Sequence, residues 1–277
     1  MSKWIKVAGI VLATLVVDIG MHMGLAPAPK YTSPESAFVA NGSFLPVAAG
    51  LLVVTYVVLA AVFTVIQSRL PGSRVRKGLV FGLAFGGLML VGAPAMSLMF
   101  GSPLTAELKV GAVDGLAITL LGVLLGRFTA TDGTAGELGL GRLATSGLVV
   151  GLVYVAIHLA AYAVVPSLFP SDPGRAAETA TWIAVVGVWV GVMNHLLGDA
   201  FARGTKVRQA IAFALVGFGA FSIVNVLFAP VFVQAPIGTL LLNACLGIAA
   251  AGVGAWAQRV VAPVLQSSAR ERRAAAA

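Results

Sequence analysis

Residues 44–67 read FLPVAAGLLVVTYVVLAAVFTVIQ and contain no charged side chain. An α-helix needs about 20 consecutive apolar residues to cross the hydrocarbon core of a bilayer. Further runs reach this length at about 5–24, 78–100, 105–127, 146–169, 181–201, 209–231 and 237–259. The sequence therefore predicts an all-α, polytopic membrane protein, a bundle of eight transmembrane helices.

The composition of the whole chain supports this fold class. Of the 277 residues, 59% are hydrophobic and 10% are charged, whereas a soluble domain has roughly 45–50% apolar and about 25% charged residues. These values exclude a soluble enzyme and a disordered chain. The single Cys245 excludes a disulfide scaffold, and the continuous apolar runs argue against a transmembrane β-barrel, whose strands alternate in polarity.

The first apolar run also has features of a secretory signal peptide. A basic start, MSKWIK, precedes it, and the sequence Ala-Pro-Ala follows it at 26–28. However, Asp18 and His22 interrupt the run, which is longer than the core of a usual signal peptide. We therefore expect it to form the first transmembrane helix.

Basic residues are distributed unequally between the two sides of the predicted bundle. Of the 18 lysines and arginines, 15 flank the spans on one side, and only Lys30, Lys109 and Arg175 fall on the other. Because loops rich in Lys and Arg remain in the cytoplasm, we predict that both termini are cytoplasmic. The short loops favour a bacterial cytoplasmic membrane. A basic rim facing anionic lipid accounts for the isoelectric point near 10.2 without a nucleic-acid partner.

An internal repeat divides the predicted bundle into two halves. The third span begins with RVRKGLVFGL at 74–83, and the seventh begins with KVRQAIAFAL at 206–215, an offset of 132 residues. The first and fifth spans align at an offset of 136, which places His22 on His158. We therefore expect two parallel four-helix repeats, related by an axis along the membrane normal.

The repeat defines the predicted domains: a first four-helix repeat at 1–130, a second at 140–262, and a mobile cytoplasmic tail at 263–277. Glycines at four-residue spacing in the third and fourth spans allow helices to approach closely. They predict tight helix contacts, either within the chain or with other membrane subunits or a second copy of it. Pro94 and Pro230 predict bends in the third and seventh spans.

Two histidines inside the predicted spans are candidate ligands. His22 and His158 occupy equivalent repeat positions, and each follows a polar residue by one helical turn, Asp18 and Tyr154 respectively. A metal ion or haem bridging the two halves could use both imidazoles, with Asp18 and Tyr154 as supporting partners. Methionines beside His22 make copper one candidate. Alternatively, each histidine hydrogen-bonds a neighbouring helix or belongs to a proton or substrate path.

Other polar residues within the predicted spans suggest a pathway. Asp114 lies near the middle of the fourth span, and Asn225 and Asn243 lie in the seventh and eighth. Ionisable groups in a bilayer are functional candidates because burying them is costly. We therefore predict a polar pathway lined by Asp18, Asp114, Asn225 and Asn243. The Asn194-His195 pair, with Asp199 one turn later, is expected to be a capped cluster near the cytoplasmic end.

The sequence favours two non-enzymatic functions. It contains no zinc helix of the His-Glu-x-x-His type, no Gly-x-Ser-x-Gly elbow, no phosphate loop and no dinucleotide fingerprint. A duplicated bundle with bent helices and a few buried polar groups is typical of small transporters or permeases. The alternative is a scaffold subunit, or a metal- or haem-binding subunit, of a larger membrane complex.

Overall fold

The computed structural model describes residues 2–26, 29–133, 140–169 and 173–276. Within these residues, eight helical segments are long and apolar enough to span a membrane. They are Lys3–Leu25, Phe44–Ile66, Arg74–Phe100, Leu104–Thr129, Gly141–Val164, Ala176–Phe201, Lys206–Phe232 and Ile237–Ala262. The chain is therefore an all-helical integral membrane protein, as the hydropathy of the sequence predicts.

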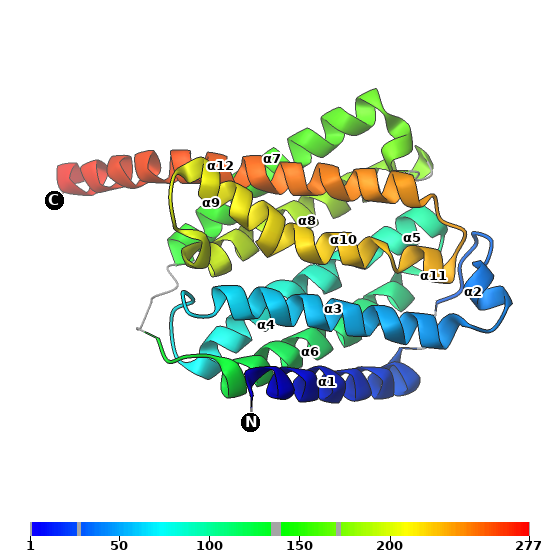
Figure 1. Cartoon of the computed structure of the whole chain (residues 1–277). Helices are drawn as coiled ribbons and strands as arrows, with labels where there is room; N and C mark the ends of the chain where they lie inside the picture. Colours follow the sequence, from blue (N-terminus) through cyan, green and yellow to red (C-terminus); the bar gives the residue numbers. More distant parts are fainter. Residues whose placement is uncertain (1, 27–28, 134–139, 170–172, 277) are drawn as a thin grey trace.

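Six of these spans are built on a single α-helix each. These helices are α1 (Lys3–Leu25), α3 (Phe44–Ile66), α6 (Leu104–Thr129), α7 (Leu140–Val164), α8 (Ala176–Leu197) and α12 (Ile237–Ala276). The spans lie side by side in Figure 1, and both termini lie at the same end of the bundle. The short helix α2 (Ala37–Ala40) caps the opposite end, within the connection from α1 to α3.

The third and seventh spans are interrupted helices. The third consists of α4 (Arg74–Gly92) and α5 (Pro94–Phe100), and the seventh of α9 (Lys206–Ala212), a π-helical segment (Phe213–Gly219), α10 (Ala220–Val226) and α11 (Ala229–Phe232). Pro94 and Pro230 both lie in the first turn of the helix that follows an interruption. Because proline cannot donate the backbone hydrogen bond of a continuous helix, these are the positions where the sequence predicts bends.

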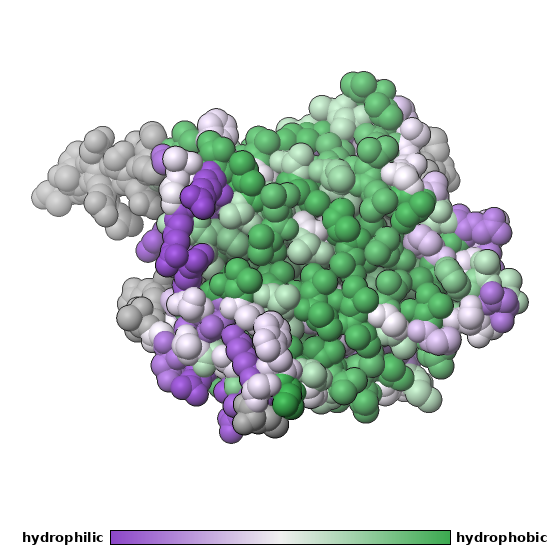
Figure 2. Space-filling model, viewed as in Figure 1, coloured by the Kyte–Doolittle hydropathy of each residue, from purple (hydrophilic) through white to green (hydrophobic). Residues whose placement is uncertain are grey.

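The surface of the bundle matches a lipid environment. Figure 2 shows a broad apolar face between two more hydrophilic ends. Large side chains on this outer surface are exposed, among them Val16 on α1, Leu148 on α7 and Leu242 on α12. In water such a surface would be an aggregation or binding patch, but in a bilayer the lipid tails cover it.

Glycines hold α4 and α6 in close contact. A Cβ atom on Gly82 would lie 2.8 Å from the backbone of Thr119, and one on Gly122 would lie 2.7 Å from the Cα atom of Gly82. Gly86 and Gly115 also approach each other through their backbones. The glycine faces of these two helices therefore pack against each other inside the chain. An oligomer or a contact with other subunits stays a prediction.

Four phenylalanine rings pack against one another between the spans. The rings of Phe63 and Phe81 have centroids 5.1 Å apart, those of Phe81 and Phe85 are 4.7 Å apart, and those of Phe85 and Phe221 are 5.8 Å apart. All four side chains are buried. This phenylalanine stack joins α3, α4 and α10 across the centre of the molecule.

The observed helix ends differ from the predicted runs at several places, among them the start of α7, which lies at Leu140 rather than near 146. α7 ends at Val164 rather than near 169, because Pro166 begins a short 3-10 turn. α8 begins at Ala176 rather than near 181, with Glu178 in its first turn accepting hydrogen bonds from Arg175. α12 continues as a helix to Ala276 through the segment predicted as a tail, whose mobility stays a prediction.

Candidate functional site

A central cavity of about 550 Å³ lies in the half of the bundle away from the two termini. All eight spans contribute to its wall, which is mostly apolar. The volume falls within the roughly 300–1,000 Å³ of small-molecule sites. Six residues that the sequence singled out line this cavity: His22, Asp114, Tyr154, His158, Asn225 and Asn243.

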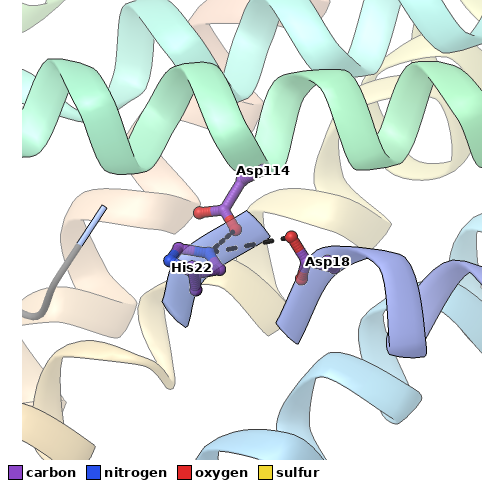
Figure 3. A group of neighbouring side chains, drawn as sticks. All are labelled: Asp18, His22 and Asp114. Atoms are coloured by element: carbon purple, nitrogen blue, oxygen red, sulfur yellow. Dashed lines mark hydrogen bonds and ion pairs between the residues drawn. The ribbon is translucent and has the colours of Figure 1, made fainter. Parts of the chain in front are cut away.

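One wall of the cavity carries a cluster of Asp18, His22 and Asp114, which we call the Asp–His–Asp cluster (Figure 3). The Nε2 atom of His22 lies 2.8 Å from Oδ1 of Asp114 and 3.7 Å from Oδ1 of Asp18. Asp18 is completely buried, whereas the side chains of His22 and Asp114 are partly accessible. Two carboxylates therefore converge on the same imidazole nitrogen.

Helix geometry and helix packing assemble this cluster together. Asp18 and His22 are one turn apart on α1, so their side chains project from the same face. Asp114 comes from the middle of α6, which packs along α1. The hydroxyl of Tyr56, on α3, donates a hydrogen bond of 2.7 Å to Oδ2 of Asp18. Three spans of the first half thus fix the two carboxylates around His22.

The second ring nitrogen of His22 faces the backbone. Its Nδ1 atom lies 3.4 Å from the carbonyl oxygen of Ala26, at the end of the same helix. When Nδ1 carries the proton and donates to this carbonyl, Nε2 presents a lone pair to the carboxylates. Such a backbone partner is the usual support for an imidazole that binds a metal ion.

His158 has different partners, on its own helix. Its Nδ1 atom lies 2.9 Å from the carbonyl oxygen of Tyr154, and the two rings stack with centroids 4.1 Å apart. Tyr154 therefore supports His158, as its spacing suggested, but through its backbone and ring face. No hydrogen bond joins the imidazoles of His22 and His158, both of which are described, and a shared copper or haem site between them stays a prediction.

The predicted polar pathway converges on the cavity. Asp114, Asn225 and Asn243 line it, and Asp18 lies behind His22 in the same wall. The hydroxyl of Tyr162 donates a hydrogen bond of 2.7 Å to Oδ1 of Asn243. The structure thus places these groups around one space, where a single molecule could contact several of them.

A third buried carboxyl group in the wall, Glu107, is not among the residues that the sequence singles out. Glu107, near the start of α6, accepts a hydrogen bond of 2.6 Å from the hydroxyl of Ser102. Tyr31 lies near Glu107, in the connection between α1 and α3. Burial and the neighbouring Glu107 raise the pKa of Tyr31 well above its usual range, so Tyr31 remains protonated. The general cost of an ionisable residue within a span was the signal that could have identified Glu107.

A polar network near the other end of the bundle lies outside the cavity. The amide of Asn194 donates to the hydroxyl of Ser146, 3.2 Å away, and Arg259 donates to the Oδ1 atom of Asn194 over 2.9 Å. These bonds tie α7, α8 and α12 together. His195, the neighbour of Asn194, keeps a buried Nε2 atom without a hydrogen bond among the described residues.

Comparison with protein families, with curated proteins and with solved structures found no match for this chain. The arrangement offers an apolar space for a small molecule and a buried acidic cluster for a cation or a polar group.

Proposed function

We propose that the protein is a small-molecule transporter in which the central cavity is the substrate site. The observation that carries this proposal is the position of the cavity: every span lines it, and it lies in one half of the bundle only. A transporter exposes one central site to each side in turn. In one of these states the site is open toward one face of the membrane, and packed side chains separate it from the other face. A cavity in one half of the bundle is consistent with such a state.

The interrupted spans support a change between two such states. Discontinuous helices in corresponding positions of two halves commonly mark the binding site of secondary transporters. Here the third and seventh spans are both interrupted, and α5 and α11 contribute Met96 and Phe232 to the cavity wall. Movement at these interruptions would separate Phe85 from Phe221 and open the phenylalanine stack.

The wall indicates the chemistry of the substrate. Among the described residues that line the cavity, the carboxyl groups are Glu107 and Asp114, and none is a lysine or an arginine. An apolar wall with acidic groups favours a compact, largely apolar molecule whose polar end is neutral or cationic. An anionic polar end would face two carboxyl groups without a basic side chain to offset them.

Cysteine accessibility tests whether the cavity opens to both sides. In a Cys245→Ser background, Ser222→Cys places a thiol on the cavity wall. A membrane-impermeant methanethiosulfonate is applied to intact spheroplasts and to inverted membrane vesicles. Pro29 and Tyr31, in the connection between α1 and α3, line the cavity. We expect the thiol to react rapidly when the reagent is applied to the membrane face on which this connection lies, and more slowly when it is applied to the face on which the termini lie.

Two variants calibrate this experiment. Ser146→Cys places a thiol in a fully buried contact between α7 and α8 and should react from neither side. Phe85→Ala, combined with Ser222→Cys, opens the phenylalanine stack. It should speed modification of the Ser222→Cys thiol by reagent applied to the membrane face on which the termini lie. If Ser222→Cys reacts from that side only when Phe85 is removed, the cavity is a fixed pocket, and the transport proposal is wrong.

The second candidate function is a metal-holding subunit of a larger membrane complex. The observation that favours it is the Asp–His–Asp cluster, which has the donor atoms of a metal site. Purification in a mild detergent distinguishes the two. A complex subunit should be recovered with defined partner proteins at constant stoichiometry, whereas a transporter should be recovered as this chain alone or as copies of it.

A further inference from the structure

We propose that Asp18, His22 and Asp114 bind a single divalent transition-metal ion on the wall of the cavity. This inference goes beyond the proposed transport and does not depend on it. Zinc is the ion used here to define the site, because imidazole and carboxylate are among its protein ligands. The two carboxylates come from α1 and α6, and the imidazole from α1.

The hydrogen bonds of the cluster leave one buried acceptor, Oδ1 of Asp18, without a donor among the described residues. A carboxylate offers only acceptors, and an imidazole protonated at Nδ1 offers a lone pair at Nε2. A proton on Nε2 would satisfy Asp114, 2.8 Å away, but leaves Oδ1 of Asp18 at 3.7 Å. This Oδ1 atom is buried, points toward His22 in Figure 3, and accepts no hydrogen bond from any residue that the structure describes. A metal ion would bind all three atoms at once.

The distances match those between ligands of one ion. Metal–nitrogen and metal–oxygen bonds of about 2.0–2.2 Å place neighbouring ligand atoms ~3–3.5 Å apart. The two measured separations from Nε2 of His22, 2.8 Å and 3.7 Å, bracket this range. One ligand atom from each residue lies within 4.8 Å of the others. Small shifts of these side chains would therefore complete the site.

Charge balance is compatible with a divalent ion. Two ionised carboxylates beside a protonated imidazole would leave one net negative charge in the apolar interior, and an uncompensated charge within a bilayer is costly. A proton on one carboxyl group removes this charge, and so does a divalent ion beside a neutral imidazole. The metal content of the protein distinguishes these two states.

The surroundings hold each ligand in a suitable orientation. Tyr56 binds Oδ2 of Asp18 and leaves Oδ1 directed at the cluster. The carbonyl of Ala26 lies 3.4 Å from Nδ1 of His22 and can accept a hydrogen bond from it when Nε2 binds an ion. Hydrogen bonds of this kind orient the ligands of known metal sites. Since His22 and Asp114 line the cavity, a remaining coordination position would face a molecule bound there.

Zinc binding to the purified full-length protein in detergent tests the inference. The protein is stripped with a chelator, loaded with zinc sulfate and desalted, and the metal is then quantified by mass spectrometry. We expect one zinc ion per chain. X-ray absorption at the zinc edge should show one imidazole and otherwise oxygen ligands, whereas a site shared by His22 and His158 would show two imidazoles.

Matched variants locate the ion. Asp18→Asn, His22→Gln and Asp114→Asn should each weaken zinc binding at least tenfold. His158→Gln and Glu107→Gln alter groups on the same cavity outside the cluster and should bind zinc as the unmodified protein does. Size-exclusion profiles identify any variant that fails to fold. The X-ray absorption spectrum of the unmodified protein reports the number of imidazole ligands without the use of variants.

Three results would overturn the inference: no zinc retained by the unmodified protein, two imidazoles in its absorption spectrum, or equal binding by the unmodified protein and a folded Asp18→Asn variant. None of them bears on whether the cavity opens to both sides, which the cysteine experiment measures separately. Failure of the metal site and failure of the transport proposal can therefore be distinguished.

Discussion

Tyr56 is the residue on which the geometry of the Asp–His–Asp cluster depends most directly. Its hydroxyl is the donor to Oδ2 of the fully buried Asp18. Removing that donor leaves a buried carboxylate oxygen unsatisfied, at a cost of about 1–3 kcal/mol. We therefore expect Tyr56→Phe to lower the free energy of unfolding by this amount, measured by denaturation in mixed micelles, and to weaken zinc binding about 10–100-fold.

Tyr162→Phe is the matched control for this prediction. Tyr162 also donates a hydrogen bond of 2.7 Å, but its acceptor is the neutral amide oxygen of Asn243, outside the cluster. A bond between neutral groups contributes about 0.5–1.5 kcal/mol, and zinc binding should be unchanged. Equal effects of the two substitutions on zinc binding would show that Tyr56 does not orient a ligand.

Two of the three residues of the cluster could be paired from the sequence. The spacing of Asp18 and His22 predicts that both lie on one face of α1, because residues one turn apart are neighbours on a helix. The partner from α6 could not be predicted, since Asp114 lies 92 positions from His22 and meets it only through helix packing. The repeat pointed to His158 instead, which the structure places on the same cavity with partners of its own.

At the scale of helices, the contact of α4 with α6 depends on the absence of side chains. A Cβ atom on Gly82 would lie 2.8 Å from both the Cα atom and the carbonyl oxygen of Thr119. Since backbone cannot yield as a flexible side chain can, Gly82→Ala must separate the helices. Overpacking typically costs about 1–3 kcal/mol, and we expect a lower midpoint of thermal unfolding in detergent.

Gly92, at the end of the same helix, provides the comparison. A Cβ atom there would meet nothing within 4 Å, so Gly92→Ala should leave the unfolding midpoint unchanged or raise it slightly. If Gly82→Ala is tolerated as well as Gly92→Ala, close backbone contact does not hold α4 against α6.

The helices were the most predictable part of the fold. A membrane requires long apolar segments, and each predicted run overlaps an observed span. Helix interruptions at Pro94 and Pro230 could also be anticipated, because proline leaves a visible mark in the sequence. The π-helical segment Phe213–Gly219 could not, since its residues differ little from those of the α-helical repeat partner in α4.

For the whole molecule, some helix contacts have counterparts in the other half, as a duplication predicts, whereas the extensive packing of α7 on α8 has a much smaller counterpart between α1 and α3. α1 packs on α6 in the first half as α7 packs on α12 in the second. Between the halves, α5 contacts α8 and α11 contacts α3, an exchange expected for a twofold relation. The duplication stays a prediction until residues 1–130 and 140–262 are superposed in an experimental structure. Four helices that overlay in order after a rotation near 180° would establish it.

The orientation of the bundle is a prediction about the whole molecule, and it depends on charge. Both termini lie at one end in Figure 1, where α4 and α9 begin with Arg74, Arg76, Lys206 and Arg208. Retention of basic loops in the cytoplasm places this end inside. A fluorescent protein fused after Ala277 should therefore fluoresce, because it folds in the cytoplasm, and an alkaline phosphatase fusion there should be inactive.

The converse fusion tests the other end of the bundle. Alkaline phosphatase inserted after Gly42, beside α2, should be active, since Lys30 and Glu35 give this connection no excess of positive charge. An inactive enzyme there, together with an active one after Ala277, would invert the topology. The cavity would then open toward the cytoplasm, and a transporter in this state would be poised to load its substrate from inside the cell.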